Sequence, residues 1–259
     1  MDSNTEAPGK LSRMFLTLYD VFQFISRFFK EGFLPPYEGK ELMKQCYDIG
    51  YKSLALISLT GFITGVVFTK QSRPSLAEFG ATSWLPSLVG IALLRTLAPL
   101  LTSLIAAGKV GSSIGAELGS MRVTEQIDAM EVSATNPFKF LVTTRVLAAT
   151  ITIPILTFYT AMVGMLGALL NVSTSEGTSA KAFFQSALES ITFLDITAST
   201  VKAILFGFTI GMVGCYQGYN SSKGTEGVGK AANSAVVVGM FLIFIEEVVS
   251  VQFFGLFRT

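Results

Sequence analysis

The sequence has no histidine and few charged residues. None of its 259 residues is histidine, and only 14% are charged, whereas soluble domains carry roughly 25%. The lack of histidine removes the commonest general base and the commonest metal ligand. The low charge leaves the chain with little polar surface to present to water.

Cysteine and dense basic runs are also scarce. Cys46 and Cys215 lie far apart without a CxxC pattern, which predicts two buried thiols rather than a disulfide or a metal site. A net charge of +1 without a basic block gives no sign of nucleic-acid binding. Residues 1–11 resemble neither a secretory signal nor a transit peptide, so the first membrane helix is expected to direct its own insertion.

Long apolar runs recur along the whole sequence. Each approaches or exceeds the roughly 20 residues that cross a bilayer as a helix, and each is too continuous for a barrel strand. The chain is therefore predicted to be an all-α integral membrane protein, with a kink point at Pro154 in its long third span. The predicted spans are residues 49–69, 86–107, 140–170, 199–216 and 232–256.

An aromatic segment precedes the spans. Residues 14–34 mix phenylalanine and tyrosine with charged residues and are followed by Pro35 and Pro36. This mixture predicts an amphipathic helix that lies in the membrane interface, although a packed helix of a small soluble domain is an alternative. The expected organisation is a cytoplasmic tail (1–13), an interfacial helix with its linker (14–48), and one five-span domain (49–259).

Lysine and arginine predict the orientation. Most precede the first span or lie in the second and fourth connections, and the positive-inside rule places these segments in the cytoplasm. The N-terminus is then cytoplasmic and the C-terminus periplasmic. The basic residues on the predicted cytoplasmic side are Lys10, Arg13, Arg27, Lys30, Lys40, Lys44, Lys52, Lys109, Arg122, Lys139, Arg145, Lys223 and Lys230. The opposite side has only Lys70, Arg73, Lys181 and Arg258, with Lys202 at a helix edge.

Glycines recur at the spacing that permits close helix packing. Gly61 and Gly65 form one GxxxG pair, Gly207 and Gly211 form another, and residues 111–119 repeat the spacing twice. Small residues let helix backbones approach each other in lipid. The motif fits packing within one chain and dimerisation equally well.

The charged segment 109–137 separates the second and third spans. Val123, Ile127 and Met130 recur at helical spacing, and Asn136-Pro137 is expected to stop the helix. A short amphipathic helix joined to two membrane spans is suited to docking an apolar ridge in a partner's groove. The alternative is a solvated helix with no partner.

The same segment carries a family resemblance. The run AELGSMRVTEQIDAME, residues 116–131, resembles the signature of MlaE/YrbE permeases. The later Gly218-Tyr219-Asn220 and residues 224–230 are also similar to that family, and the resemblance extends from Phe33 to Phe254. It favours the coupling-helix interpretation over the solvated one.

The resemblance implies the permease subunit of an ABC transporter, acting as a homodimer in the bacterial inner membrane. It implies a cytoplasmic ATPase that binds ATP and Mg²⁺, so no cofactor is expected in this chain. An MCE-domain protein on the periplasmic side, and in some members a STAS-domain protein, complete the assembly. The implied cargo is phospholipid moved between inner membrane and outer envelope. The implied ATPase-coupling residues are Glu117, Arg122, Glu125, Ile127, Asp128, Met130 and Glu131.

Arg95 lies near the middle of the second predicted span. A charge at that depth is costly and usually marks a function. An ion pair with Glu246 or Glu247 of the last span and direct contact with an anionic head group are the two interpretations. The family commonly reads Arg-Glu-Leu-Gly-Pro where this chain has Thr96 after Arg95, which puts any role of that glutamate in doubt. The resemblance adds Phe68, Leu76, Phe79 and Leu97 as apolar lipid-binding positions.

Other functions fit the sequence less well. Residues 224–231 nearly form a phosphate-binding P-loop, but Ala231 replaces the Mg²⁺-binding hydroxyl and no strand precedes it. They are interpreted as a cytoplasmic turn with Lys230 near the interface. For an enzyme, Ser199 and Lys202 could be proposed as a catalytic dyad, yet a helix-capping serine and a snorkelling lysine explain that pair better. The aspartates that could serve an enzyme are scattered along the chain: Asp20, Asp48, Asp128 and Asp195.

A permease for another hydrophobic cargo, such as a sterol, is the alternative to a phospholipid permease.

Overall fold

The protein is an assembly of long membrane-spanning helices. The computed structural model describes residues 10–32, 35, 38–222 and 224–257, and every regular element in these ranges is a helix. Five helical segments are long and apolar enough to cross a membrane, which confirms the predicted fold class. They are Gly39–Glu78, Thr82–Val123, Phe138–Thr174, Phe193–Tyr219 and Thr225–Gly255. Residues 1–9 of the predicted tail, Pro36, Lys223 and Arg258 lie outside the described residues.

Each predicted span corresponds to one segment, but the helices extend beyond it. The first comprises α2 (Gly39–Gly50), η1 (Tyr51–Ser53) and α3 (Leu54–Glu78). The second comprises η2 (Thr82–Trp84), α4 (Leu85–Ala92), η3 (Leu93–Leu97), α5 (Ala98–Ala106), η4 (Ala107–Gly111) and α6 (Ser112–Val123). The third comprises η5 (Phe138–Thr143) and α8 (Thr144–Glu176), the fourth is α10 (Phe193–Tyr219), and the fifth is α11 (Thr225–Gly255). Among these, η3, η4 and η5 are π-helical turns.

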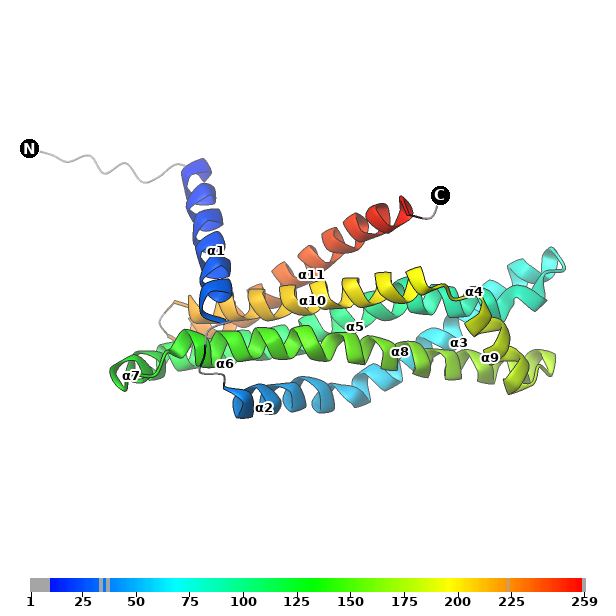
Figure 1. The fold of residues 1–259 in the computed structure, drawn as a ribbon, viewed down its shortest axis with the longest axis horizontal. Coiled ribbons are helices and arrows are strands. Elements are labelled where there is room, and N and C mark those ends of the chain that lie inside the picture. The colour runs from blue at the N-terminus through cyan, green and yellow to red at the C-terminus, as the bar shows by residue number, and fades with distance from the viewer. Residues whose placement is uncertain (1–9, 33–34, 36–37, 223, 258–259) are drawn as a thin grey trace, which may run out of the picture.

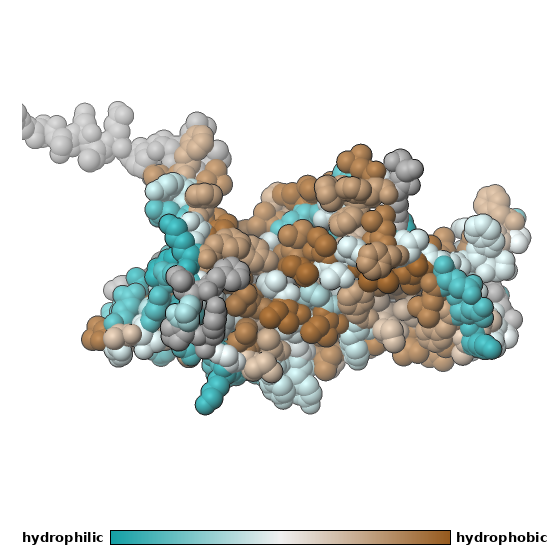
Figure 2. All heavy atoms as spheres, viewed as in Figure 1, coloured by the Kyte–Doolittle hydropathy of each residue, from teal (hydrophilic) through white to brown (hydrophobic). Residues whose placement is uncertain are grey.

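The connections alternate between the two ends of the bundle. Figure 1 shows α1 (Lys10–Gly32) and α7 (Gln126–Val132) at the same end as the α10–α11 connection. The α3–α4 connection and α9 (Ala180–Glu189), a short helix that the sequence did not predict, lie at the other end. Segments predicted on the cytoplasmic side therefore lie together. In Figure 2, apolar side chains cover the middle of the displayed face and hydrophilic ones gather towards its ends.

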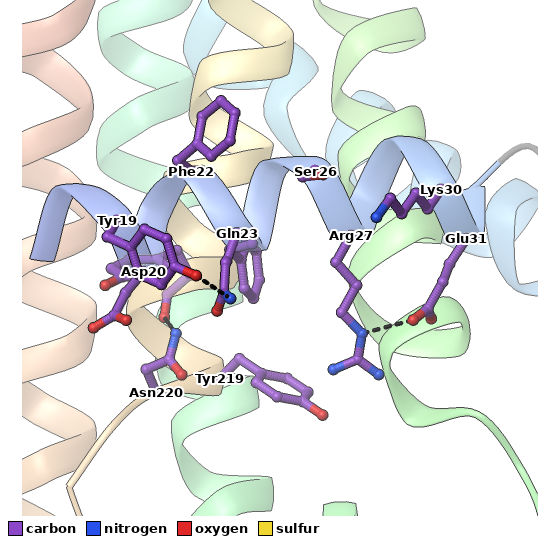
Figure 3. A pocket seen from close by; sticks show the side chains of 12 residues that line it. Tyr19, Asp20, Phe22, Gln23, Ser26, Arg27, Lys30, Glu31, Tyr219 and Asn220 are labelled. Carbon is purple, nitrogen blue, oxygen red and sulfur yellow. Dashed lines mark hydrogen bonds and ion pairs between the residues drawn. The ribbon is translucent and has the colours of Figure 1, made fainter. Parts of the chain in front are cut away.

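Helix α1 lies across the bundle at the predicted cytoplasmic end (Figure 1). Phe24 is buried and its ring packs edge-on against Phe138 at 4.9 Å. Phe22 is 69% exposed and lies on the opposite side of α1 from Tyr219 and Asn220 (Figure 3). Arg27 lies over the Phe138 ring at 4.3 Å. A groove of about 650 Å³ separates the polar side of α1 from the end of α10. The predicted amphipathic helix is present and ends at Gly32, and its place in the interface stays a prediction.

Helix α8 occupies the centre of the bundle, between α3 and α10. At Gly65 a Cβ atom would overlap the carbonyl oxygen of Gly164, so α3 approaches the α8 backbone too closely for any side chain. A Cβ at Gly211 would lie 2.8 Å from the Cα of Val146. Gly65 and Gly211 therefore serve helix packing within one chain. At these two positions the GxxxG spacing is explained without dimerisation.

Candidate coupling surface and membrane-embedded charge cluster

The segment between the second and third spans contains two helices rather than one. Helix α6 prolongs the second span and ends at Val123. Glu125 then adopts the left-handed conformation at φ 58°, which turns the chain into the short helix α7. Figure 1 shows α7 at the extreme end of the bundle. Helix α7 is therefore joined through α6 to the second span.

The apolar ridge of this segment faces inward. Ile127 is fully buried and Met130 packs against the main core cluster, so the ridge binds the chain's own bundle. The prediction that this ridge docks in a partner's groove is wrong for Ile127, because the core already occupies its side chain. The outer face instead presents Val132, which is 89% exposed, together with the exposed acids Asp128 and Glu131.

Ion pairs fix the segment to the bundle. Arg122 Nη1 lies 2.6 Å from Asp128 Oδ1 and joins α6 to α7. Glu117 Oε1 lies 2.8 Å from Nη2 of Arg145, whose side chain is only 2% exposed, and joins α6 to α8. Three of the predicted coupling residues, Glu117, Arg122 and Asp128, thus form ion pairs within the chain. Their contact with an ATPase stays a prediction.

The prediction that Asn136-Pro137 stops the helix is wrong. Helix α7 ends at Val132, and Ala134 takes a left-handed conformation at φ 57°. Pro137 instead precedes the first residue of η5, a position where its missing N–H costs no hydrogen bond. The Asn136 side-chain amide donates to Glu31 at 2.8 Å and ties this loop to α1.

Arg95 forms an ion pair inside the membrane-spanning region, but with a partner that the sequence did not predict. Its Nη2 lies 2.9 Å from Asp195 Oδ1, whereas Glu246 and Glu247 form no ion pair with it in the described structure. Asp195 is buried at the start of α10, where a capping box with Thr192 fixes its carboxylate. The prediction of a pair with the last span is therefore wrong.

Lys202 forms the second buried ion pair. Its ammonium lies 2.8 Å from Glu247 Oε1 and also donates to the Arg95 carbonyl oxygen at 3.3 Å. The side chain is 2% exposed, so the prediction of a snorkelling lysine is wrong. Glu246 accepts a hydrogen bond from the Thr209 hydroxyl. These contacts join the second, fourth and fifth spans through charged groups.

A cavity of about 200 Å³ lies beside these ion pairs. Its polar lining includes Arg95, Thr96, Asp195 and Lys202, and its apolar lining includes Phe254. Both cations are already neutralised by carboxylates, so an anionic ligand would have to compete with them. Thr96 adds a hydroxyl-bearing side chain to this lining.

The predicted lipid-binding residues divide between two places. Phe68, Leu76 and Leu97 are half-buried and pack against one apolar cluster near the predicted periplasmic end. Phe79 is 84% exposed and does not join them, and Arg95 faces the charged cavity. The cluster consists of Leu85, Val89, Leu93, Met165, Ala168, Val172 and Phe183.

The roles of Asp195 and Lys202 were missed from the sequence, although their spacing carried a signal. Residues seven apart lie two turns along one helix face, so both side chains share the α10 surface that meets Arg95. The predicted fourth span began at residue 199, which left Asp195 outside it. Hydropathy alone therefore gives no reason to pair Asp195 with Arg95.

The glycine-rich residues near the α10–α11 connection form a helix start, not a P-loop. Gly224 has φ 101° and caps α11, which begins at Thr225 and continues through Lys230. The prediction of a turn is correct only for its first residue, because the rest of the stretch is helical.

Comparison with known proteins identifies a matching family profile and several similar proteins. The sequence profile described as Permease MlaE matches residues 42–253. A probable ABC transporter permease protein of Rickettsia typhi is 38% identical over 230 residues, which are 89% of this chain and 88% of that protein. A probable ABC transporter permease protein of Synechocystis is 36% identical over 229 residues, or 86% of this chain and 87% of that protein. The chloroplastic protein TRIGALACTOSYLDIACYLGLYCEROL 1 of Arabidopsis thaliana is 33% identical over 215 residues, which are 83% of this chain and 61% of that protein.

Proposed function

The chain belongs to the MlaE permease family, and from this membership we propose that it is the membrane subunit of an ABC transporter for phospholipids. The observation that carries the proposal is the α6–α7 extension at one end of the second span. It offers an ATPase an exposed apolar residue, Val132, on a helix joined directly to a span. The names of the Rickettsia and Synechocystis relatives support the same role.

The mechanism that we propose follows the second span. Movement of an ATPase against α7 would shift α6 and, through it, the span that carries Arg95 and Leu97. Two π-helical turns, η3 and η4, interrupt this span, and such turns are frequent at functional sites because the regular hydrogen-bond ladder is broken there. ATP and Mg²⁺ would be bound by the separate ATPase chain, so this chain would be a transporter subunit and not an enzyme.

The proposed setting is a homodimer in the bacterial inner membrane, with the N-terminus cytoplasmic and the C-terminus periplasmic. An MCE-domain protein would act on the periplasmic side, and a STAS-domain protein would associate with the ATPase in some assemblies. The exposed apolar residues of α11, among them Phe241, Phe244 and Val248, support burial in lipid or against a second copy.

Two observations favour a cargo with acyl chains, the class to which phospholipids belong. The Arabidopsis relative is named after a glycerolipid. Phe68, Leu76 and Leu97 contribute to an apolar cluster, and each acyl CH₂ removed from water gains about 0.8 kcal/mol. We propose movement of such lipids between inner membrane and outer envelope.

The cargo class is tested by native mass spectrometry of the complex with its own ATPase. The complex is purified from membranes, equilibrated with equal amounts of phospholipid and sterol, and its bound lipids are identified. We expect phospholipid to be retained in preference to sterol. Preferential retention of sterol would overturn the phospholipid assignment while leaving the permease assignment intact.

A further inference from the structure

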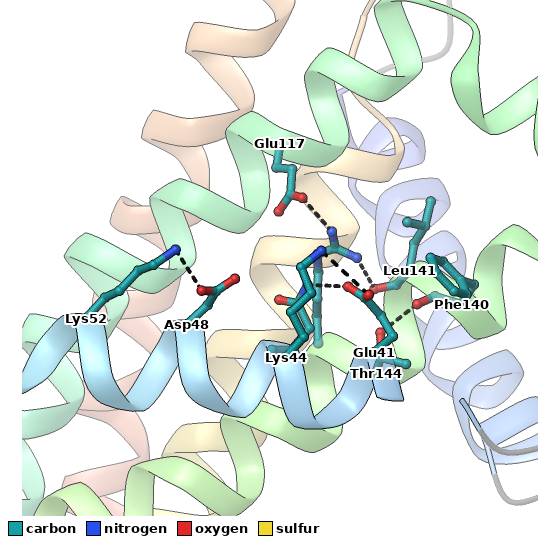
Figure 4. A network of polar contacts seen from close by, with 10 residues as sticks. Glu41, Lys44, Asp48, Lys52, Glu117, Phe140, Leu141 and Thr144 are labelled. Carbon is teal, nitrogen blue, oxygen red and sulfur yellow. Dashed lines mark hydrogen bonds and ion pairs between the residues drawn. The ribbon is translucent and has the colours of Figure 1, made fainter. Parts of the chain in front are cut away.

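A pocket of about 290 Å³ lies between the start of the first span and the end of the second. It is formed by α2 and η1 on one side and by η4 and α6 on the other, at the same end as α7 (Figures 1 and 4). Its lining residues that bear on a ligand are Asp48, Lys52, Ser53, Lys109, Ser113 and Glu117.

The pocket and the adjoining Arg145 together carry one positive charge in excess. Lys52 Nζ lies 2.7 Å from Asp48 Oδ1, and the buried Arg145 is paired with Glu117, so both carboxylates have a cation of their own (Figure 4). Lys109 donates to the backbone carbonyl oxygen of Lys52 and forms no ion pair with a carboxylate in the described part of the chain. Its ammonium therefore leaves one positive charge uncompensated.

Ser53 adds an unsatisfied hydrogen-bond donor. The residue is fully buried, and its hydroxyl has no hydrogen-bond partner among the described residues although it lines the pocket. A buried hydroxyl without a partner is unfavourable, so Ser53 is able to donate to an acceptor that enters the pocket, whether a water or an anion. Together with Lys109 it presents one neutral and one charged donor to an anion.

The exposed residues around the pocket indicate how deep it lies in the membrane. Tyr47 and Tyr51, on the same helical segment, are exposed and stack at 5.0 Å. Exposed tyrosines are typical of the head-group level of a bilayer. From Lys52 onwards, exposed apolar residues continue along one face of α3 at helical spacing, namely Leu56, Leu59, Ile63 and Val67. A polar pocket at head-group level thus leads into an apolar stripe.

We propose that this pocket binds the phosphate of a membrane phospholipid, with the Lys109 ammonium and the Ser53 hydroxyl donating to phosphate oxygens. The acyl chains would lie along the stripe of α3, outside a pocket whose volume suits a head group alone. This inference rests on the proposed function and adds to it an entry position at the predicted cytoplasmic leaflet, away from the apolar cluster at the other end.

The test uses the complex with its ATPase in nanodiscs of phosphatidylethanolamine and phosphatidylglycerol. A phospholipid with a diazirine in its acyl chain is photolysed, and labelled peptides are mapped by mass spectrometry. We expect labelling of residues 53–67, and a roughly tenfold lower yield in a Lys109→Gln/Ser53→Ala variant, because a charged hydrogen bond and a neutral one are lost. Lys109→Arg keeps the charge and should retain labelling.

The matched control is Lys44→Gln, which removes an exposed lysine of α2 outside the pocket and should leave the yield unchanged. A diazirine diacylglycerol, which lacks phosphate, should not label these residues. Equal labelling by diacylglycerol, or an unchanged yield in the double variant, would overturn the inference. Binding of inorganic phosphate by the complex without any phospholipid labelling of these residues would reassign the pocket to a free anion.

The same samples separate this inference from the proposed function. Bound phospholipid is measured by native mass spectrometry alongside the labelling. If the complex holds phospholipid but residues 53–67 are unlabelled, the entry position alone is refuted. If it holds no phospholipid, the proposed cargo is refuted as well.

Discussion

A Glu247→Leu variant is expected to melt roughly 10 °C below the wild-type protein in detergent. The substitution leaves Lys202 buried without a carboxylate, and breaking a buried ion pair in this way costs about 3–5 kcal/mol. One kcal/mol corresponds to roughly 2–4 °C in a chain of this size. The melting temperature is measured by fluorescence-detected size-exclusion chromatography after heating.

The double variant Lys202→Met/Glu247→Leu should recover most of this loss, because no uncompensated charge remains. Glu226→Leu, which removes an exposed acid from the same helix, is the matched control and should stay close to wild type. If the double variant is as unstable as Glu247→Leu, the instability does not come from the stranded lysine. If the double variant is stable but its complex no longer moves lipid, the ion pair serves transport rather than folding.

A Val132→Asp variant is expected to bind the ATPase at least about tenfold more weakly than wild type. Val132 is the most exposed large apolar residue at the tip of α7, and loss of an apolar anchor at the centre of an interface costs about 2 kcal/mol or more. Aspartate also adds charge beside Asp128 and Glu131. Affinity is measured by titrating purified ATPase onto the permease in nanodiscs.

Leu188→Asp is the control for this experiment, since it places the same change on an exposed residue of α9 at the opposite end. Its ATPase affinity should match wild type. Ile127→Asp would not test docking, because Ile127 is fully buried and its substitution would disturb the core. An unchanged affinity for Val132→Asp would place the docking surface elsewhere.

Hydropathy predicted the number and order of the spans because each must keep its apolar side chains in lipid over a fixed thickness. It did not predict their ends. The second helix runs from Thr82 to Val123, whereas the apolar run covers residues 86–107, because the helix continues through the π-helical turn η4 into the polar segment. Helix α9 was missed because ten residues between two spans leave too short a pattern.

The ion pairs and the buried ridge required three-dimensional information. Arg95 and Asp195 are a hundred residues apart, and only the crossing of the second and fourth spans brings them together. The helical spacing of Val123, Ile127 and Met130 correctly predicts an apolar helix face. A pattern gives the existence of such a face but not what covers it, and here the covering surface is the chain's own core.

The central claim is that this permease couples an ATPase to phospholipid, and ATP hydrolysis by the reconstituted complex tests it most directly. The chain and a candidate ABC ATPase from the same organism are purified together and reconstituted in phospholipid nanodiscs, and hydrolysis is compared with that of the isolated ATPase. The account predicts that the two proteins purify as one complex, that hydrolysis depends on phospholipid, and that Val132→Asp abolishes this dependence. An ATPase that does not associate with the chain, or whose hydrolysis ignores both the permease and the phospholipid, would contradict it.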